Sequence, residues 1–206
     1  MPQPAPEATP EAARRHAPAT LRNREAILAV LRPALPATGL VLEVASGSGE
    51  HCAFLAAALP GLTFQPSDPD PDARASTDAW CPGQANIRPA LALDAAGAWP
   101  ALRAQAVLCI NMVHISPWAA TLGLLRQAAA VLPAGAPLYL YGPYREGGAH
   151  TAESNAAFDA SLRERNPAWG VRDLEAVAEA AAAQGFGAPA VTRMPANNLS
   201  LLFRRG

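Results

Sequence analysis

The sequence of 206 residues contains no lysine, so all 16 of its basic side chains are arginines. This absence excludes the nucleotide hydrolases whose phosphate-binding loop requires a lysine. It also excludes chemistry through a lysine Schiff base, as in pyridoxal enzymes. The 17 acidic side chains bring the net charge to -1. A broad surface for nucleic acid or anionic membrane is therefore not expected, because such surfaces need clustered positive charge.

Cysteine is scarce as well. Cys52, Cys81 and Cys109 are odd in number and form no C-x-x-C pair, so neither a metal site nor a disulfide framework is predicted. The sequence also lacks the apolar core of a signal peptide and any apolar run long enough to span a membrane. We therefore expect a soluble protein in the cytoplasm.

Length and composition favour one folded domain. Half of the residues are hydrophobic, which is enough to build a sizeable core. Residues 1–18 differ from the rest, because they are rich in proline, alanine and glutamate and have almost no large apolar side chains. We interpret residues 1–18 as a flexible N-terminal tail and residues 19–206 as the single domain.

Predicted strands and helices alternate through most of this domain. Such alternation predicts an α/β fold with a doubly wound, Rossmann-like sheet. A longer polar segment, residues 145–170, interrupts the alternation and is interpreted either as a lid that recognises an acceptor or as an ordinary surface insertion. The expected strands cover residues 40–44, 62–65, 91–93, 106–111, 137–141, 190–193 and 199–204.

A turn of small residues follows the first predicted strand. Ala45, Gly47 and Gly49 lie in this turn, and small residues there allow the backbone to approach a ligand closely. The helix that follows presents free backbone amides to the same place. By itself, such a turn is equally compatible with a tight strand–helix connection that binds nothing.

Acidic residues at the ends of the next two predicted strands favour a ligand. Asp68 and Asp94 end the second and third strands, and in a parallel sheet these ends meet at one edge. A carboxylate in the position of Asp68 is suited to accept hydrogen bonds from both ribose hydroxyls. The alternative for Asp68 is a turn or helix-capping aspartate. Taken together, the turn and the two acids indicate a nucleoside site.

The identity of the nucleoside follows from charge. The NAD fingerprint needs a third glycine where Cys52 stands. Glu43, at the end of the first strand, is poorly placed beside a diphosphate but suits a cationic amino acid group. S-adenosylmethionine carries adenine, ribose, a sulfonium and an ammonium group without phosphate. The pattern therefore favours S-adenosylmethionine over NAD(P).

Several longer motifs resemble one family. Residues 23–205 resemble the methyltransferase-like 26 family, a group with the class I methyltransferase fold that was long catalogued as a domain of unknown function. The resemblance implies a seven-stranded sheet whose last strand is antiparallel, and S-adenosylmethionine as cofactor, but no established substrate. The motifs that carry it are LEVASGSGEH, QPSDPD, CINMVHISPW, LYGPY, SNAAFDASLRERNPAWGVRDLE and PANNLSLLFRR.

The resemblance also implies roles for individual residues. Four residues match the glycine motif of methyltransferases, two match the acids for ribose and for the adenine amine, and one matches the position that faces methionine and the methyl group. Ala45 departs from the wider superfamily, which usually has glycine there, and is tolerable if its backbone is not left-handed. The residues, in that order, are Glu43, Ala45, Gly47 and Gly49, then Asp68 and Asp94, and then Asn111.

Two residues are candidates for a part in catalysis. His114 follows Asn111 closely and is a candidate general base, since imidazole titrates near neutrality. The alternative is a histidine that caps the helix beginning after Ser116. Tyr144 follows the fifth strand and is a candidate for walling the acceptor pocket or for stabilising the sulfonium, with structural packing as the alternative.

The sequence thus predicts an S-adenosylmethionine-dependent methyltransferase that acts on a small-molecule or peptide acceptor. The acceptor and the oligomeric state are not indicated by the sequence. Two alternatives remain open at this point. The first is a catalytically silent scaffold that binds S-adenosylmethionine, and the second, less favoured, is an NAD(P)-dependent oxidoreductase.

Overall fold

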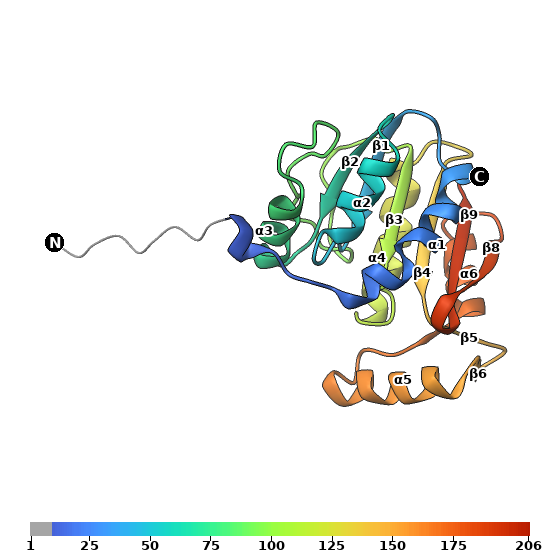
Figure 1. Ribbon diagram of the computed structural model, residues 1–206. Coiled ribbons are helices and arrows are strands. Elements are labelled where there is room, and N and C mark those ends of the chain that lie inside the picture. Colours follow the sequence, from blue (N-terminus) through green and yellow to red (C-terminus); the bar gives the residue numbers. More distant parts are fainter. Residues whose placement is uncertain (1–9) are drawn as a thin grey trace.

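A six-stranded sheet lies at the centre of the computed structural model, which describes residues 10–206 (Figure 1). The strands are arranged in the order β2-β1-β3-β4-β9-β8. The first four of these are parallel, whereas β9 runs antiparallel to both β4 and β8. The mostly parallel α/β sheet predicted from the sequence is confirmed. The strands are β1 (Gly39–Val44), β2 (Leu62–Ser67), β3 (Ala106–Ile110), β4 (Pro137–Gly142), β8 (Ala190–Met194) and β9 (Asn198–Arg204).

Helices cover both faces of this sheet. Neighbouring strand residues point to opposite faces, so Val41 packs with α1 and α2 while Leu42 packs with α4 and α6. Within residues 10–206, no helix is both long and apolar enough to span a bilayer. The helices are α1 (Pro18–Ala34), α2 (Glu50–Ala58), α3 (Pro71–Trp80), α4 (Trp118–Val131), α5 (Glu153–Arg165) and α6 (Leu174–Ala182), with short 3-10 turns η1 (Pro10–Ala13) and η2 (Pro195–Asn197).

The polar segment after β4 forms a small substructure of its own. Three short strands, β5 (Tyr144–Glu146), β6 (Ala149–His150) and β7 (Arg172–Asp173), make a second sheet in the order β6-β5-β7. Helix α5 lies beyond the strand ends, apart from the two helical layers (Figure 1). Strands of two or three residues leave no periodic pattern in the sequence to detect.

The predicted third strand, residues 91–93, is not a strand. Among the described residues, the chain beside β2 forms two isolated parallel bridges, Phe64 with Ile87 and Ser67 with Leu91. Pro66 in β2 has no backbone N–H to donate to this chain, so a continuous ladder is interrupted there. The bridges nevertheless carry the chain along β2 and bring Asp94 to the edge of the sheet.

The predicted N-terminal tail, residues 1–18, differs in part from the structure. Residues 1–9 lie outside the described residues. Arg14 and Arg15, in contrast, contact α3: the Arg15 backbone N–H donates to Ser76 Oγ at 2.8 Å, and Trp80 Nε1 donates to the Arg15 carbonyl at 2.9 Å. The segment then runs from α3 to the start of α1 (Figure 1). Contacts with the domain therefore begin before residue 18.

Helix α4 approaches the loop that carries Asp94 through a glycine. A Cβ atom added at Gly123 would lie 2.3 Å from the Ala95 carbonyl oxygen and 2.6 Å from the Ala96 Cα. Both of these neighbours are backbone atoms, so the loop itself would have to move. Gly123 is therefore required by packing rather than by its backbone angles.

We predict that Gly123→Ala destabilises the protein by about 1–3 kcal/mol, because overpacking displaces the loop. In an unobstructed helix the same change stabilises by up to about 1 kcal/mol. Urea unfolding measures the difference. Ala130→Gly at an exposed position of α4 is the control and should cost about 1 kcal/mol through helix propensity alone. A stabilised Gly123→Ala protein would contradict the observed contact.

Candidate functional site

The carboxyl ends of β1, β2 and β3 open into a hollow of about 520 Å³. This volume lies within the range of small-molecule sites. The hollow is at the edge where ligands bind in doubly wound sheets. Five of the residues predicted from the sequence line it together, namely Ala45, Gly47, Asp68, Asp94 and Asn111.

The turn after β1 is a sharp bend with left-handed backbone. Ala45 has a φ of 60° and Gly47 a φ of 59°. Alanine was expected to be tolerated at position 45 only if its backbone was not left-handed. The backbone of Ala45 is left-handed, which costs about 1–2 kcal/mol. Hydrogen bonds hold the bend: Ser67 Oγ donates to the Glu43 carbonyl at 2.8 Å, and the Ser46 N–H donates to the Ser67 carbonyl at 2.9 Å. Strain held in this way is typical of a functional site.

The two glycines of the bend serve different purposes. A Cβ atom at Gly47 would meet no atom within 4 Å, so this residue borders open space. A Cβ atom at Gly49 would lie 2.4 Å from the Thr77 Cα. Gly49 therefore allows the start of α2 to pack against α3, and it does not line the hollow.

Asp68 joins the bend to the end of β2. Its carboxylate is buried, with one oxygen 3.0 Å from the Gly47 N–H and the other 3.0 Å from the Asp70 N–H. An ionised carboxylate has about four acceptor positions, so two backbone donors leave capacity for ligand hydroxyls. Asp94, on the loop beside α4, accepts a hydrogen bond from the Ala96 N–H at 2.9 Å, which fixes its carboxylate at the edge of the hollow.

Asn111 follows β3 in a left-handed conformation. Its φ is 62°, and its backbone N–H donates to the Tyr141 carbonyl at 2.9 Å. Asparagine tolerates this conformation better than most residues. The end of β3 is thus turned so that Asn111 lines the hollow opposite Asp68, with the β1 bend between them.

Glu43 lies behind the bend and not in the lining of the hollow. The residue is 2% exposed, and its Oε2 atom has no hydrogen-bond partner among the described residues. Burial raises the pKa of Glu43 to about 7, against the opposing effect of hydrogen bonds with the side chains of Ser46 and Cys52. The structure therefore holds a buried carboxyl group that lacks a counter-charge directly beneath the bend.

The two candidate catalytic residues do not line the hollow. Tyr144 is buried in the core between the sheet and α4, where burial raises the pKa of its hydroxyl. His114 is also buried, which lowers the pKa of its imidazole to about 4. Its ring contacts Phe158 of α5 edge-on at 5.6 Å and lies over Gly142. His114, predicted as a general base, and Tyr144, predicted as a wall of the acceptor pocket, thus both lie outside the lining of the hollow.

Other residues of the lining had no signal in the sequence. Ala17, Ala19 and Thr20 come from the start of α1, and Trp169 comes from the chain after α5. Residues so distant in sequence meet only through the tertiary fold, so no local pattern identifies them. His51 of α2, in contrast, directly follows the glycine turn; it also lines the hollow, and its Nε2 atom lies 2.8 Å from Asn23 Oδ1.

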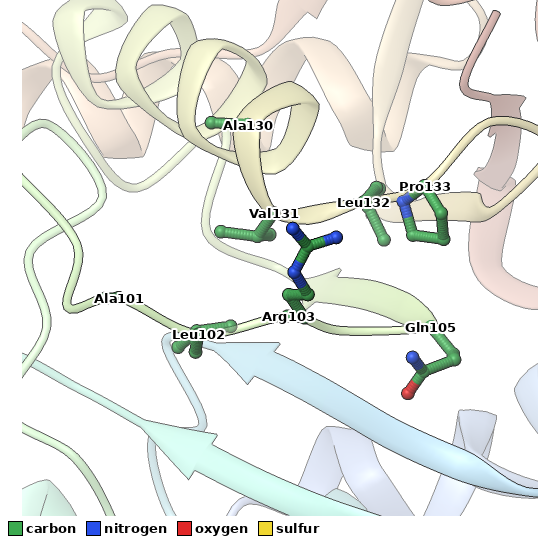
Figure 2. A pocket seen from close by; sticks show the side chains of 8 residues that line it. All are labelled: Ala101, Leu102, Arg103, Gln105, Ala130, Val131, Leu132 and Pro133. Carbon is green, nitrogen blue, oxygen red and sulfur yellow. The ribbon is translucent and has the colours of Figure 1, made fainter.

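A second hollow, of about 560 Å³, lies at the opposite end of β3 (Figure 2). Arg103 points there toward Val131 at the end of α4, where a cation complements the helix dipole (Figure 2). Gln105 accepts a hydrogen bond from the Leu40 N–H at 2.6 Å and thereby holds two strands together. Both polar side chains thus have structural roles, and the first hollow remains the candidate site.

Comparison with protein families gives one match over most of the chain. Residues 14–205 match a family described as a protein of unknown function, DUF938. The chain belongs to this family. The narrower resemblance to the methyltransferase-like 26 family stays a prediction.

Several solved structures with a similar arrangement are methyltransferases. The chain is similar to an O-methyltransferase family protein from Burkholderia thailandensis (TM-score 0.72, 17% identity, covering 89% of this chain and 58% of that one). It is also similar to the mitomycin 7-O-methyltransferase MmcR (0.78, 16%, 91% and 54%). A third is the O-methyltransferase NcsB1 from neocarzinostatin biosynthesis, solved with S-adenosylmethionine and 2-hydroxy-5-methyl naphthoic acid (0.72, 17%, 91% and 55%).

The DUF938 chain therefore has the fold of the S-adenosylmethionine-dependent methyltransferases. It spans little more than half the length of these three structures. The six strands of its main sheet differ from the seven that were expected, because the chain beside β2 forms bridges in place of a strand.

We predict that Glu43→Gln stabilises the ligand-free protein at pH 8. The folded-state pKa of Glu43 is raised to about 7, so the folded state binds the proton more tightly than the unfolded chain. Its contribution to stability is present below about pH 4.5 and is lost as the pH rises through 7. The amide avoids this loss, which is on the order of 3 kcal/mol.

Urea unfolding at pH 5 and pH 8 checks this expectation. The advantage of Glu43→Gln should be large at pH 8 and small at pH 5, where the wild-type carboxyl group is mostly protonated. Glu164→Gln, at an exposed position of α5, is the control and should keep the wild-type dependence on pH. An equal effect of Glu43→Gln at both values would show that Glu43 is ionised throughout in the folded state.

Proposed function

We propose that this DUF938 protein binds S-adenosylmethionine and transfers its methyl group to a small acceptor. The observation that carries the proposal is the β1 bend, which joins Asp68 on the hollow side to the uncompensated Glu43 on its buried side. Acidic groups on both sides of a narrow bend suit a positively charged nucleoside and oppose a diphosphate. The methyltransferase fold supports the same ligand.

The residues present fit the cofactor along the edge of the sheet. Asp68 would accept hydrogen bonds from the ribose hydroxyls, and Asp94 would accept one from the adenine amine. Asn111 would contact the methionine portion at the other side of the bend. The ammonium group of the ligand would compensate the charge of Glu43 from the other side of the β1 bend. The two charges would lie close together because the residues of the bend are small.

The remaining task of the protein is alignment. Bound S-adenosylmethionine supplies a methyl group already activated by its positively charged sulfur. The walls contributed by Thr20, Ile115 and Trp169 would position the acceptor against the methyl group, which is the main contribution that methyl transfer requires. We assign no general base, because His114 and Tyr144 lie outside the lining of the hollow.

Binding is tested by a thermal shift with S-adenosylhomocysteine, the product form of the cofactor. At one hundred times its dissociation constant, mass action stabilises the folded state by about 2.7 kcal/mol. For a domain of this size we expect a rise in Tm of about 5–10 °C. NADH, measured in parallel at the same concentration, should give no shift. A shift with NADH alone would favour an oxidoreductase.

We predict that Asp68→Ala and Gly47→Val each remove most of this shift. The first deletes the ribose acceptor, and the second places a branched side chain in the open space at the bend, where φ is 59°. Asp72→Ala is the matched control, because Asp72 is an exposed member of the same acidic run and does not line the hollow. Unchanged shifts in both site variants would exclude the hollow as the cofactor site.

Activity is tested by transfer of a labelled methyl group to a small-molecule extract. We expect a labelled small product with the wild-type protein, and with Asp68→Ala a loss of at least tenfold at limiting cofactor. A protein that shows the thermal shift but yields no labelled product from small-molecule or peptide pools would be a silent binder. That outcome would contradict transfer while leaving cofactor binding intact.

A further inference from the structure

The hollow is divided by charge into two halves. The carboxylates of Asp68 and Asp94 form the acidic half of the lining. The other half comes from the end of β3, the chain leading into α4, the start of α1, His51 and Trp169. It contains no Asp, Glu or Arg among the described residues, and its members are Ala17, Ala19, Thr20, His51, Ile110, Asn111, Met112, Ile115, Ser116, Pro117, Ala120 and Trp169.

Exposed apolar side chains gather beside this uncharged half. Ile115 lines the hollow and is 41% exposed. Phe158 is exposed and contacts His114, the residue next to Ile115. Leu21, in the first turns of α1, is exposed as well. Exposed apolar groups concentrated at one opening indicate a binding surface, whereas scattered ones do not.

Two arginines beside Ser116 and Trp169 are already engaged. The guanidinium of Arg165 lies 5.7 Å over the ring of Trp169, and its Nε atom donates to the Ser161 carbonyl. Arg172 donates to the Ser116 carbonyl at 2.7 Å. A charged acceptor entering the half would lose water without gaining a side chain of opposite charge in the lining, which is unfavourable.

We infer that this half binds a small, uncharged, apolar compound bearing a hydroxyl group, which is the methyl acceptor. The inference rests on the proposed function. The acceptor oxygen would form the new bond to the methyl carbon with its own electron pair. The electron pair of the broken carbon–sulfur bond would stay with the sulfur as a neutral thioether, and the hydroxyl proton would pass to water.

The probes are 2-naphthol and its analogue with a 6-sulfonate group, titrated calorimetrically into protein saturated with S-adenosylhomocysteine. We expect 2-naphthol to bind at least tenfold more tightly, because the sulfonate finds no partner in the lining. Equal or tighter binding of the sulfonate would overturn the inference, and so would the absence of binding by either. A sulfonate affinity that falls in Arg165→Gln would identify an acidic acceptor instead.

Two variants with matched exposure localise the binding. Ile115→Asp should weaken 2-naphthol binding at least tenfold, whereas Leu122→Asp, on α4 and 42% exposed, should leave it unchanged. Both variants should keep the thermal shift with S-adenosylhomocysteine. An equal loss, or no loss, in the two variants would overturn the placement of the acceptor in this half.

The two hypotheses fail in different ways. Absence of a thermal shift with S-adenosylhomocysteine contradicts the proposed function. In that case the naphthol titrations are performed on the free protein. The inference about the acceptor then still requires that 2-naphthol binds at least tenfold more tightly than its sulfonate, and that Ile115→Asp weakens 2-naphthol binding at least tenfold. Cofactor binding combined with a preference for the sulfonate would contradict the acceptor class alone.

Discussion

The hydrogen bond between the Gly47 N–H and the Asp68 carboxylate determines the shape of the site. It fixes the bend after β1 against the end of β2 at 3.0 Å, in a place where Ala45 already has an unfavourable left-handed backbone. The serine hydrogen bonds beneath the bend offset this strain. The floor of the hollow is therefore shaped before any ligand arrives, which lowers the ordering cost of binding.

The same arrangement concentrates negative charge. The Asp68 carboxylate raises the pKa of buried Glu43, in addition to the larger effect of burial, and no counter-charge contacts the free Glu43 oxygen among the described residues. A residue selected for stability alone would not carry an uncompensated acid there. The presence of Glu43 is explained if this carboxyl group lowers the stability of the ligand-free protein but raises its affinity for a cationic ligand.

The sequence predicted the parts of the site that depend on local pattern. The bend follows the apolar strand β1, and Asp68 follows the predicted strand at residues 62–65, so their meeting at one edge was foreseeable. The absence of the predicted third strand was not foreseeable, because the segment that would need the missing N–H of Pro66 is brought beside it only by the tertiary fold. Glu43 was expected at the ligand, yet the alternation of β1 places it on the α1–α2 face with Val41. The wall residues Thr20 and Trp169 come from distant segments and carried no local signal.

The segment before α1 connects the two halves of the hollow. Its Ala17 N–H donates to Glu50 at 2.6 Å, and Arg15 pairs with Asp70, whose own N–H donates to Asp68. Exposed ion pairs such as Arg15–Asp70 contribute little to stability, so the half-buried hydrogen bond from Ala17 holds the segment more firmly. Since Ala17 lines the uncharged half while Asp70 steadies the acidic half, displacement of this segment would open one half and loosen the other. The proposed acceptor and cofactor sites are thus parts of a single structural unit.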